Sequence, residues 1–207
     1  MRKRICLLLS CLVLLGTLAA CKTEEAGLPE QETPRPSQSE SHEKTEEKLL
    51  PLPEEQLCFV FSSGACGWGT ELIVHADGSF EGLFRDSNMG EREEAYPNGT
   101  RYICSFRGSF GNVTKESDTA YRMELLEITL DYTVGEEWIE DGVLHIASEP
   151  YGLEDSTEFL LYLPETPVAE LSETFLSWWP GRWDDPKHET LDSYAICNVA
   201  TEQGFFG

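Results

Sequence analysis

The sequence is poor in basic residues. It has 15 lysines and arginines against 38 aspartates and glutamates, which gives a net charge of −23 at pH 7. Nucleic acid and anionic lipid headgroups would be repelled by so acidic a surface, so we expect neither as a direct partner of the folded part. A cationic protein would be attracted to it, although strong negative charge also keeps an exposed protein soluble and monomeric.

Motifs of the common hydrolases and metal sites are absent as well. There is no G-x-S-x-G nucleophile motif, no C-x-x-C pair, and His188-Glu189 lacks the second histidine of a zinc helix. The acidic cluster Glu136–Asp141 around Trp138 lacks the ligand spacing of an EF-hand, and we interpret it as a solvated loop. These absences predict a protein that is not an enzyme and that needs neither a metal nor a cofactor.

The first residues have the pattern of a secretory leader. Three basic residues at positions 2–4 precede an apolar run from about Ile5 to Leu15, which is shorter than a membrane-spanning helix of about 20 residues. Small residues close the segment, so we predict residues 1–20 as a signal peptide that is removed on export. None of the acidic residues lies in this leader, so the mature chain is more acidic still.

The leader ends in Leu18-Ala19-Ala20-Cys21, which resembles the lipobox of bacterial lipoproteins. In that motif the cysteine is acylated and becomes the first residue of the mature protein. The resemblance implies that Cys21 carries the lipid, with fatty acids such as palmitate, and holds the protein on the extracytoplasmic face of the cell membrane. An ordinary secretory signal that happens to contain a cysteine is the alternative.

Four cysteines remain for the exported chain, namely Cys58, Cys66, Cys104 and Cys197. An even number in an oxidising compartment makes two disulfides plausible, with three connectivities open. The pairing that we favour joins Cys58 to Cys197, which would tie the first strand to the last, and Cys66 to Cys104.

Residues 21–56 form the second predicted segment, which holds the lipidated cysteine and an acidic linker. Almost no large apolar residue occurs there before Leu49 and Leu50. Low hydrophobicity with high charge predicts disorder, and a coil of roughly 35 residues reaches on the order of 30 Å. Residues 57–207 then form a single domain that is large enough for a sizeable core.

The predicted domain shows mainly the period-two pattern of β-strands. Ala76-Asp77-Gly78 separates two alternating stretches and predicts a β-hairpin. From Tyr102 to Phe110 mostly aromatic side chains alternate with polar ones, as expected of a half-buried strand. About eight strands are expected in total, near residues 58–61, 71–75, 79–84, 102–110, 120–130, 143–147, 158–163 and 191–199.

One segment has helical spacing instead. Thr166-Pro167 is suited to start a helix, apolar residues from Val168 to Trp178 recur on one face, and Pro180-Gly181 ends the pattern. We predict a single amphipathic helix before the last strand. An antiparallel eight-stranded barrel with this helix packed on it is the favoured fold, because closure removes exposed sheet edges; a β-sandwich is the alternative.

Two regions resemble known families. Trp68–Val74, followed by Asp77–Gly82, resembles the opening of lipocalin-like barrels, in which a glycine and a tryptophan near the first strand precede a hairpin. The order of late strand, helix and final strand is also similar to that family. The region from Phe61 to Gly90, together with Tyr96–Thr100, resembles an uncharacterised family of lipoproteins from Gram-positive gut bacteria, which implies a location but no activity.

Trp68, Trp179 and Trp183 are the candidate ligand-binding residues, since aromatic rings bind sugars and apolar ligands well. The first functional hypothesis is a membrane-anchored, non-enzymatic protein that binds a small apolar or glycan ligand in the barrel or at its aromatic end. The alternative is an acidic protein-interaction module that captures a cationic protein or peptide as an inhibitor or decoy. A barrel filled by its own side chains would favour surface recognition.

Overall fold

The structure is a computed structural model that describes residues 48–64, 67–184 and 187–207. These residues are mainly β, as the sequence predicts. In chain order the elements are β1 (Gln56–Ser62), β2 (Trp68–His75), β3 (Ser79–Asn88), β4 (Thr100–Lys115), β5 (Ala120–Leu130), β6 (Glu137–Glu140), β7 (Val143–Ala147), β8 (Glu158–Tyr162), the 3-10 turn η1 (Val168–Glu170), α1 (Glu173–Leu176), α2 (Gly181–Asp184), β9 (Ala195–Asn198) and β10 (Gly204–Phe206).

Eight of the strands close into an antiparallel barrel. Around the ring the order is β1-β2-β3-β4-β5-β8-β9-β10, and the pairing of Val60 on β1 with Phe206 on β10 closes it. Each barrel strand thus has two hydrogen-bonded neighbours in the ring. The ring order follows the chain order, with only β6 and β7 left out. The predicted eight-stranded, lipocalin-like barrel is confirmed, and the two-sheet sandwich is excluded.

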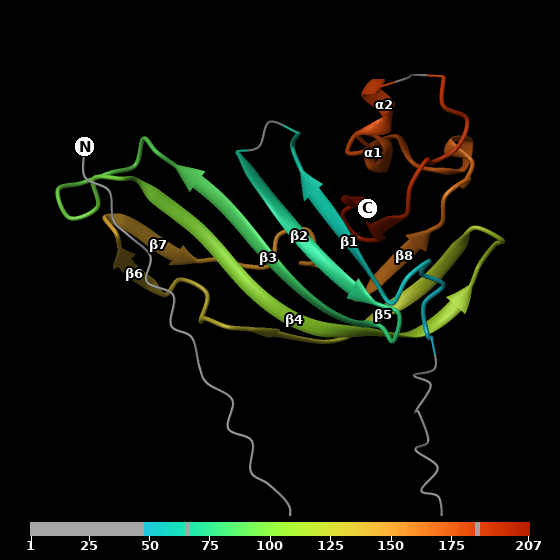
Figure 1. Ribbon diagram of the computed structural model, residues 1–207, viewed down its shortest axis with the longest axis horizontal. Coiled ribbons are helices and arrows are strands. Elements are labelled where there is room, and N and C mark those ends of the chain that lie inside the picture. The colour runs from blue at the N-terminus through green and yellow to red at the C-terminus, as the bar shows by residue number, and fades with distance from the viewer. Residues whose placement is uncertain (1–47, 65–66, 185–186) are drawn as a thin grey trace, which may run out of the picture. The chain divides into compact units, whose positions relative to one another are not determined.

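The hairpin of β6 and β7 lies outside the ring, beside the first half of β4 (Figure 1). Strand β7 pairs with β4 in parallel, from Thr100 opposite Leu144 to Ile103 opposite Ala147, and β6 pairs with β7 alone. Strand β6 therefore forms the open edge of the sheet among the described strands.

Large apolar side chains fill the barrel interior because every second residue of each strand points inward. Gly82 and Gly108 let these side chains fit, since a Cβ at Gly82 would overlap the Phe106 ring and one at Gly108 would collide with the Glu127 carbonyl oxygen. The inward residues at 0–3% exposure include Phe59, Phe61, Leu72, Val74, Phe80, Phe106, Phe110, Met123, Phe159, Leu161, Ile196 and Phe205.

Both ends of the barrel are closed. At one end the backbone N–H groups of Leu49 and Leu50 donate to the Ala76 carbonyl after β2, which places Leu50 and Leu52 in the core at 1% and 5% exposure. At the other end, where β2 begins, the Trp68 ring packs on Phe61 at a centroid distance of 5.1 Å and on Tyr151 at 5.0 Å. The folded unit thus begins before Leu57, and the prediction that the disordered linker extends to Gln56 is wrong.

The single helix predicted from Val168 to Trp178 is also wrong. Pro167 and Leu171 have extended backbones, with ψ of 124° and 150°, and Ser172 starts a new helix by accepting the Phe175 N–H at 3.1 Å. The serine side chain satisfies a helix N-terminus in the middle of the expected helix, so η1 and α1 form separately. These turns lie between β8 and β9, the sixth and seventh strands of the ring, and pack their apolar side chains as a second cluster.

The favoured disulfide between Cys58 and Cys197 is not formed. Cys58 is exposed on β1, Cys197 is buried on β9, and both have free thiols. Strand β10 lies between them, so their strands are about 10 Å apart, beyond the Cα separation of about 7 Å that a disulfide can span. Cys66 lies outside the described residues, and its pairing with the buried Cys104 stays a prediction.

Candidate functional site

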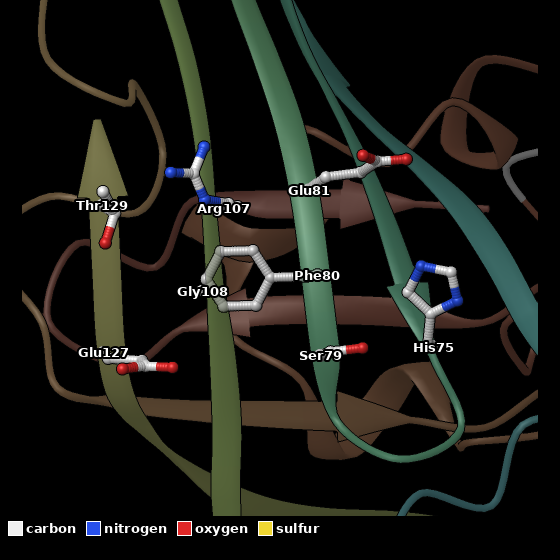
Figure 2. Close-up of a pocket in the computed structure, with 8 residues that line it drawn as sticks. All are labelled: His75, Ser79, Phe80, Glu81, Arg107, Gly108, Glu127 and Thr129. Atoms are coloured by element: carbon white, nitrogen blue, oxygen red, sulfur yellow. The ribbon is translucent and has the colours of Figure 1, made fainter. Parts of the chain in front are cut away.

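Three hollows among the described residues lie on the outer wall of the barrel. Figure 2 shows one of about 330 Å³, in which His75, Glu81, Arg107 and Glu127 surround the place where the Phe80 ring lies against Gly108. Two others, of about 290 and 410 Å³, are likewise lined mainly by outward-facing residues of β1 to β4. All three hollows therefore lie on the outside of the barrel and not in its interior.

The hollow in Figure 2 does not have the arrangement of a catalytic site. Ser79 donates its hydroxyl proton to Asp77 at 2.7 Å, within the β2–β3 turn, and not to His75. Arg107 is held by Asp131 at 2.9 Å. A nucleophile paired with a base is therefore missing from this hollow.

The three predicted ligand-binding tryptophans do not form one surface. Trp68 is half-buried in the ring cluster that closes the barrel, and Trp179 is only 3% exposed, with its Nε1–H donated to Asp192 at 3.2 Å. Trp183, on α2, is 78% exposed. Trp179 is thus buried by packing, Trp68 packs in the ring cluster but also lines the hollow of about 410 Å³, and Trp183 is the exposed one of the three.

Exposed apolar side chains gather instead around the β6–β7 hairpin. Ile139 on β6 is 50% exposed, and Tyr132 and Val134 in the preceding loop are 43% and 47% exposed. Met89, at 66%, lies at the end of β3 beside Gly99, which adjoins the hairpin. Such residues occur singly on any surface, but four on one small feature indicate a contact site.

Three aromatic rings stack on one face of the hairpin. Trp138 lies directly opposite His145 in the β6–β7 register, and their rings are 5.1 Å apart and nearly parallel, at 9°. Tyr132 stacks on the Trp138 ring at 4.7 Å. His145 is 8% exposed, and its Nδ1 has no hydrogen-bond partner among the described residues. The stack holds the half-buried Trp138 ring in place, and Tyr132, the exposed member of the stack, adds apolar surface to the hairpin.

Acidic side chains surround this apolar surface. The hairpin carries Glu136, Glu137, Glu140 and Asp141, and the β3–β4 loop adds Glu91, Glu93 and Glu94. Asn98 joins the two segments, since its backbone N–H donates to the Gly142 carbonyl at 2.9 Å and its side-chain amide donates to the Asp141 carbonyl at 2.8 Å. The loop and the hairpin thus form one acidic patch.

The negative charge of the patch raises the pKa of two tyrosines that lie between these segments. The pKa of Tyr102 is raised, first by the charge of Glu91 and then by burial, and Glu137 of the hairpin also contributes. The pKa of Tyr96 is raised by burial and by the neighbouring carboxylates Glu93, Glu91 and Glu137. A carboxylate of the hairpin therefore acts on both tyrosines together with carboxylates of the loop.

The backbone of β6 is open on its outer side. Leu144 of β7 donates its N–H to the Gly99 carbonyl on the β4 side at 3.0 Å, so it exchanges no hydrogen bonds with Ile139 opposite it. In an antiparallel pair, such a residue directs its own N–H and C=O away from its partner strand. Ile139, and Glu137 two residues before it, therefore present backbone donors and acceptors at the sheet edge.

Sequence reasoning missed this edge. It found the acidic residues around Trp138 but treated them as a solvated loop, because Glu137–Glu140 is too short to show a clear strand period. The available signal was Asp141-Gly142, a turn pair between two short apolar-containing stretches.

No family model, curated protein or solved structure matches this chain. Within the described ranges, no group of three or more histidine, cysteine or acidic residues is arranged to hold a metal ion. The same ranges contain no helix with the length and apolar character needed to cross a membrane. Cys21 lies outside the described residues.

Proposed function

We propose that this protein is a lipid-anchored, extracytoplasmic binding module without enzymatic activity, and that it captures a cationic protein or peptide on the β6–β7 hairpin. The observation that carries the proposal is the coincidence of exposed apolar side chains and uncompensated carboxylates on this hairpin. Apolar contact supplies affinity, and the surrounding charge attracts and selects a basic partner.

The charge pairing of the surface supports a cationic partner. Five basic side chains, four on the barrel and one on α2, are already held by carboxylates, in the pairs Arg85–Glu71, Arg107–Asp131, Lys115–Asp118, Arg122 with Glu116 and Glu158, and Arg182–Glu173. Among the described residues, the four carboxylates of the hairpin have no such ion pair. Their charge remains available to a partner.

The packed interior gives less support to the other sequence-based hypothesis, a small apolar or glycan ligand inside the barrel. An eight-stranded barrel has room either for its own side chains or for one small ligand, and here phenylalanine and aliphatic side chains occupy it. The lipid anchor and the extracytoplasmic location rest on the leader and on Cys21 in the sequence.

The salt dependence of binding tests the proposal. The mature chain carrying Cys21→Ala, to keep it in solution, is titrated into a fluorescent lysine- and valine-rich peptide, with a peptide in which glutamine replaces lysine as the control. We expect binding of the lysine peptide alone, with an affinity that falls at least tenfold between about 50 and 500 mM salt as the charges are screened.

A set of matched variants assigns this binding to the hairpin. Neutralising Glu136, Glu137 and Glu140 to glutamine should weaken binding at least tenfold. Neutralising Glu165, Glu170 and Glu189, which removes the same charge from residues near η1 and β9, should have a much smaller effect. Equal effects of the two triple variants, or an affinity that does not change with salt concentration, would overturn the proposed function.

A further inference from the structure

We propose that the partner binds as an added β-strand on the open edge of β6. The inference rests on the proposed function and specifies its mode: an extended basic segment forms backbone hydrogen bonds with Glu137 and Ile139. Proteins that recognise peptides at a sheet edge obtain affinity from the backbone and specificity from alternate side chains.

The backbone at this edge is ready for an added strand. Glu137 and Ile139 direct their N–H and C=O groups outward, because the residues opposite them on β7 use theirs toward β4. Every other described strand has at least two neighbours, since the ring strands lie between their neighbours in the ring and β7 lies between β4 and β6. Strand β6 is thus the described strand with a single neighbour, and a further strand can pair with it along its whole length.

The side chains of β6 define what the added strand should look like. Along Glu137, Trp138, Ile139 and Glu140 the order is acidic, apolar, apolar, acidic, with Trp138 and Ile139 on opposite faces. Residues directly across from one another in a sheet lie close enough to interact, so the complementary order is basic, apolar, apolar, basic. This order is the same in both chain directions and therefore suits a parallel or an antiparallel strand.

The same side chains disfavour a second copy of this chain at the edge. If two β6 strands paired antiparallel, with the outward-directed Glu137 of one copy opposite Ile139 of the other, Glu140 of each copy would face Glu136 of the other. Like charges directly opposite one another destabilise a strand pair, and edge charges are a common protection against such self-pairing. The charge pattern thus selects a basic strand over a second β6.

A proline substitution isolates the backbone contribution. Ile139→Pro removes an N–H that points outward and leaves the β6–β7 hydrogen bonds in place, and proline is tolerated on edge strands for this reason. Ile139→Ala is the matched control, because it loses the side chain but keeps the N–H. The probe is an octapeptide with a central Lys-Val-Val-Lys, compared with the same peptide N-methylated at alternate backbone positions.

We expect the proline variant to bind the octapeptide at least tenfold more weakly than the alanine variant, with an unchanged midpoint of urea unfolding. The N-methylated peptide should bind wild-type protein at least tenfold more weakly than the unmodified one, a result that does not depend on any variant folding. Amide hydrogen exchange at Glu137 and Ile139 should slow at least tenfold when the unmodified peptide is bound, since these N–H groups become paired.

The outcomes separate this inference from the proposed function. Salt-sensitive binding that is equal for the two variants and for the two peptides, with unslowed exchange, would overturn strand addition while leaving cationic capture in place. Absence of salt-sensitive binding to wild-type protein would remove both. Protection of the same two amides by raised protein concentration alone, with dimers seen in sedimentation, would show that the edge takes a second copy instead.

Discussion

The substitution Leu50→Ala tests whether the residues before β1 belong to the barrel. Leu50 is 1% exposed, and its N–H is bonded to the Ala76 carbonyl at 2.9 Å, so the side chain is held inside one end of the ring. Truncating a leucine in such a position costs about 3 kcal/mol, from the lost burial and the cavity left behind. The neighbouring Leu49 is 42% exposed, and its truncation should cost less than about 1 kcal/mol.

Urea unfolding followed by tryptophan fluorescence measures both costs. With a slope of about 2 kcal/mol per molar urea, the midpoint should fall by about 1.5 M for Leu50→Ala and by less than about 0.5 M for Leu49→Ala. The two variants differ only in which of two adjacent leucines is shortened, so composition and charge are matched. Equal midpoints would mean that this segment is not part of the core and would refute the reasoning.

Two further predictions concern glycine packing and thiol reactivity. Gly108→Ala should destabilise the fold by about 2 kcal/mol in urea unfolding, because its Cβ would meet the Glu127 carbonyl and the Phe80 ring. Gly67→Ala, whose Cβ would have no atom within 4 Å, should change the free energy of unfolding little. Similar values for the two variants would contradict this packing. Burial raises the pKa of Cys197 to about 12, so at pH 8 mass spectrometry should find iodoacetamide on the exposed Cys58 and not on Cys197 until the protein is unfolded. Because the unfolded thiol ionises near its ordinary pKa of 9.0, the free energy of unfolding should also fall as the pH rises above about 9, and a Cys197→Ala variant should lack that part of the loss.

The barrel itself could be predicted because its strands are long and half-buried. Alternation from Tyr102 to Phe110 and the turn at Ala76-Asp77-Gly78 are local signals, and the structure has strands β4, β2 and β3 there. The final strand β10, Gly204–Phe206, was missed because three residues carry no period. Its place between β1 and β9 depends on closure of the ring, which is a property of the whole chain.

The predicted helix failed for a different reason. The apolar residues from Val168 to Trp178 do pack together, but around two short turns, since Ser172 caps a new helix where the pattern required continuation. Spacing alone identifies which side chains are buried and does not fix the backbone that carries them. The same limit made Trp179 a candidate ligand-binding residue, although its ring is buried in the second cluster.

The candidate site was the least predictable part. Its acidic residues were visible in the sequence, but their meaning depends on β7 pairing with β4, which brings Asn98 and the β3–β4 loop to the hairpin. Contacts between segments that are more than 40 residues apart in the sequence produce no recognisable pattern within either segment. The predicted disulfide between Cys58 and Cys197 failed for the same reason. The order of strands in the ring, which separates these two residues, cannot be read from the local sequence.

The position of the β6–β7 hairpin outside the closed ring has a consequence for how this protein can change. The ring needs no hydrogen bond from β6 to close, so the tip of the hairpin can vary without opening the barrel. Selection can therefore alter what is recognised while the scaffold keeps its stability, as loops do on antibody domains. For protein engineers, exchanging Glu137–Glu140 offers a graft position on a small barrel.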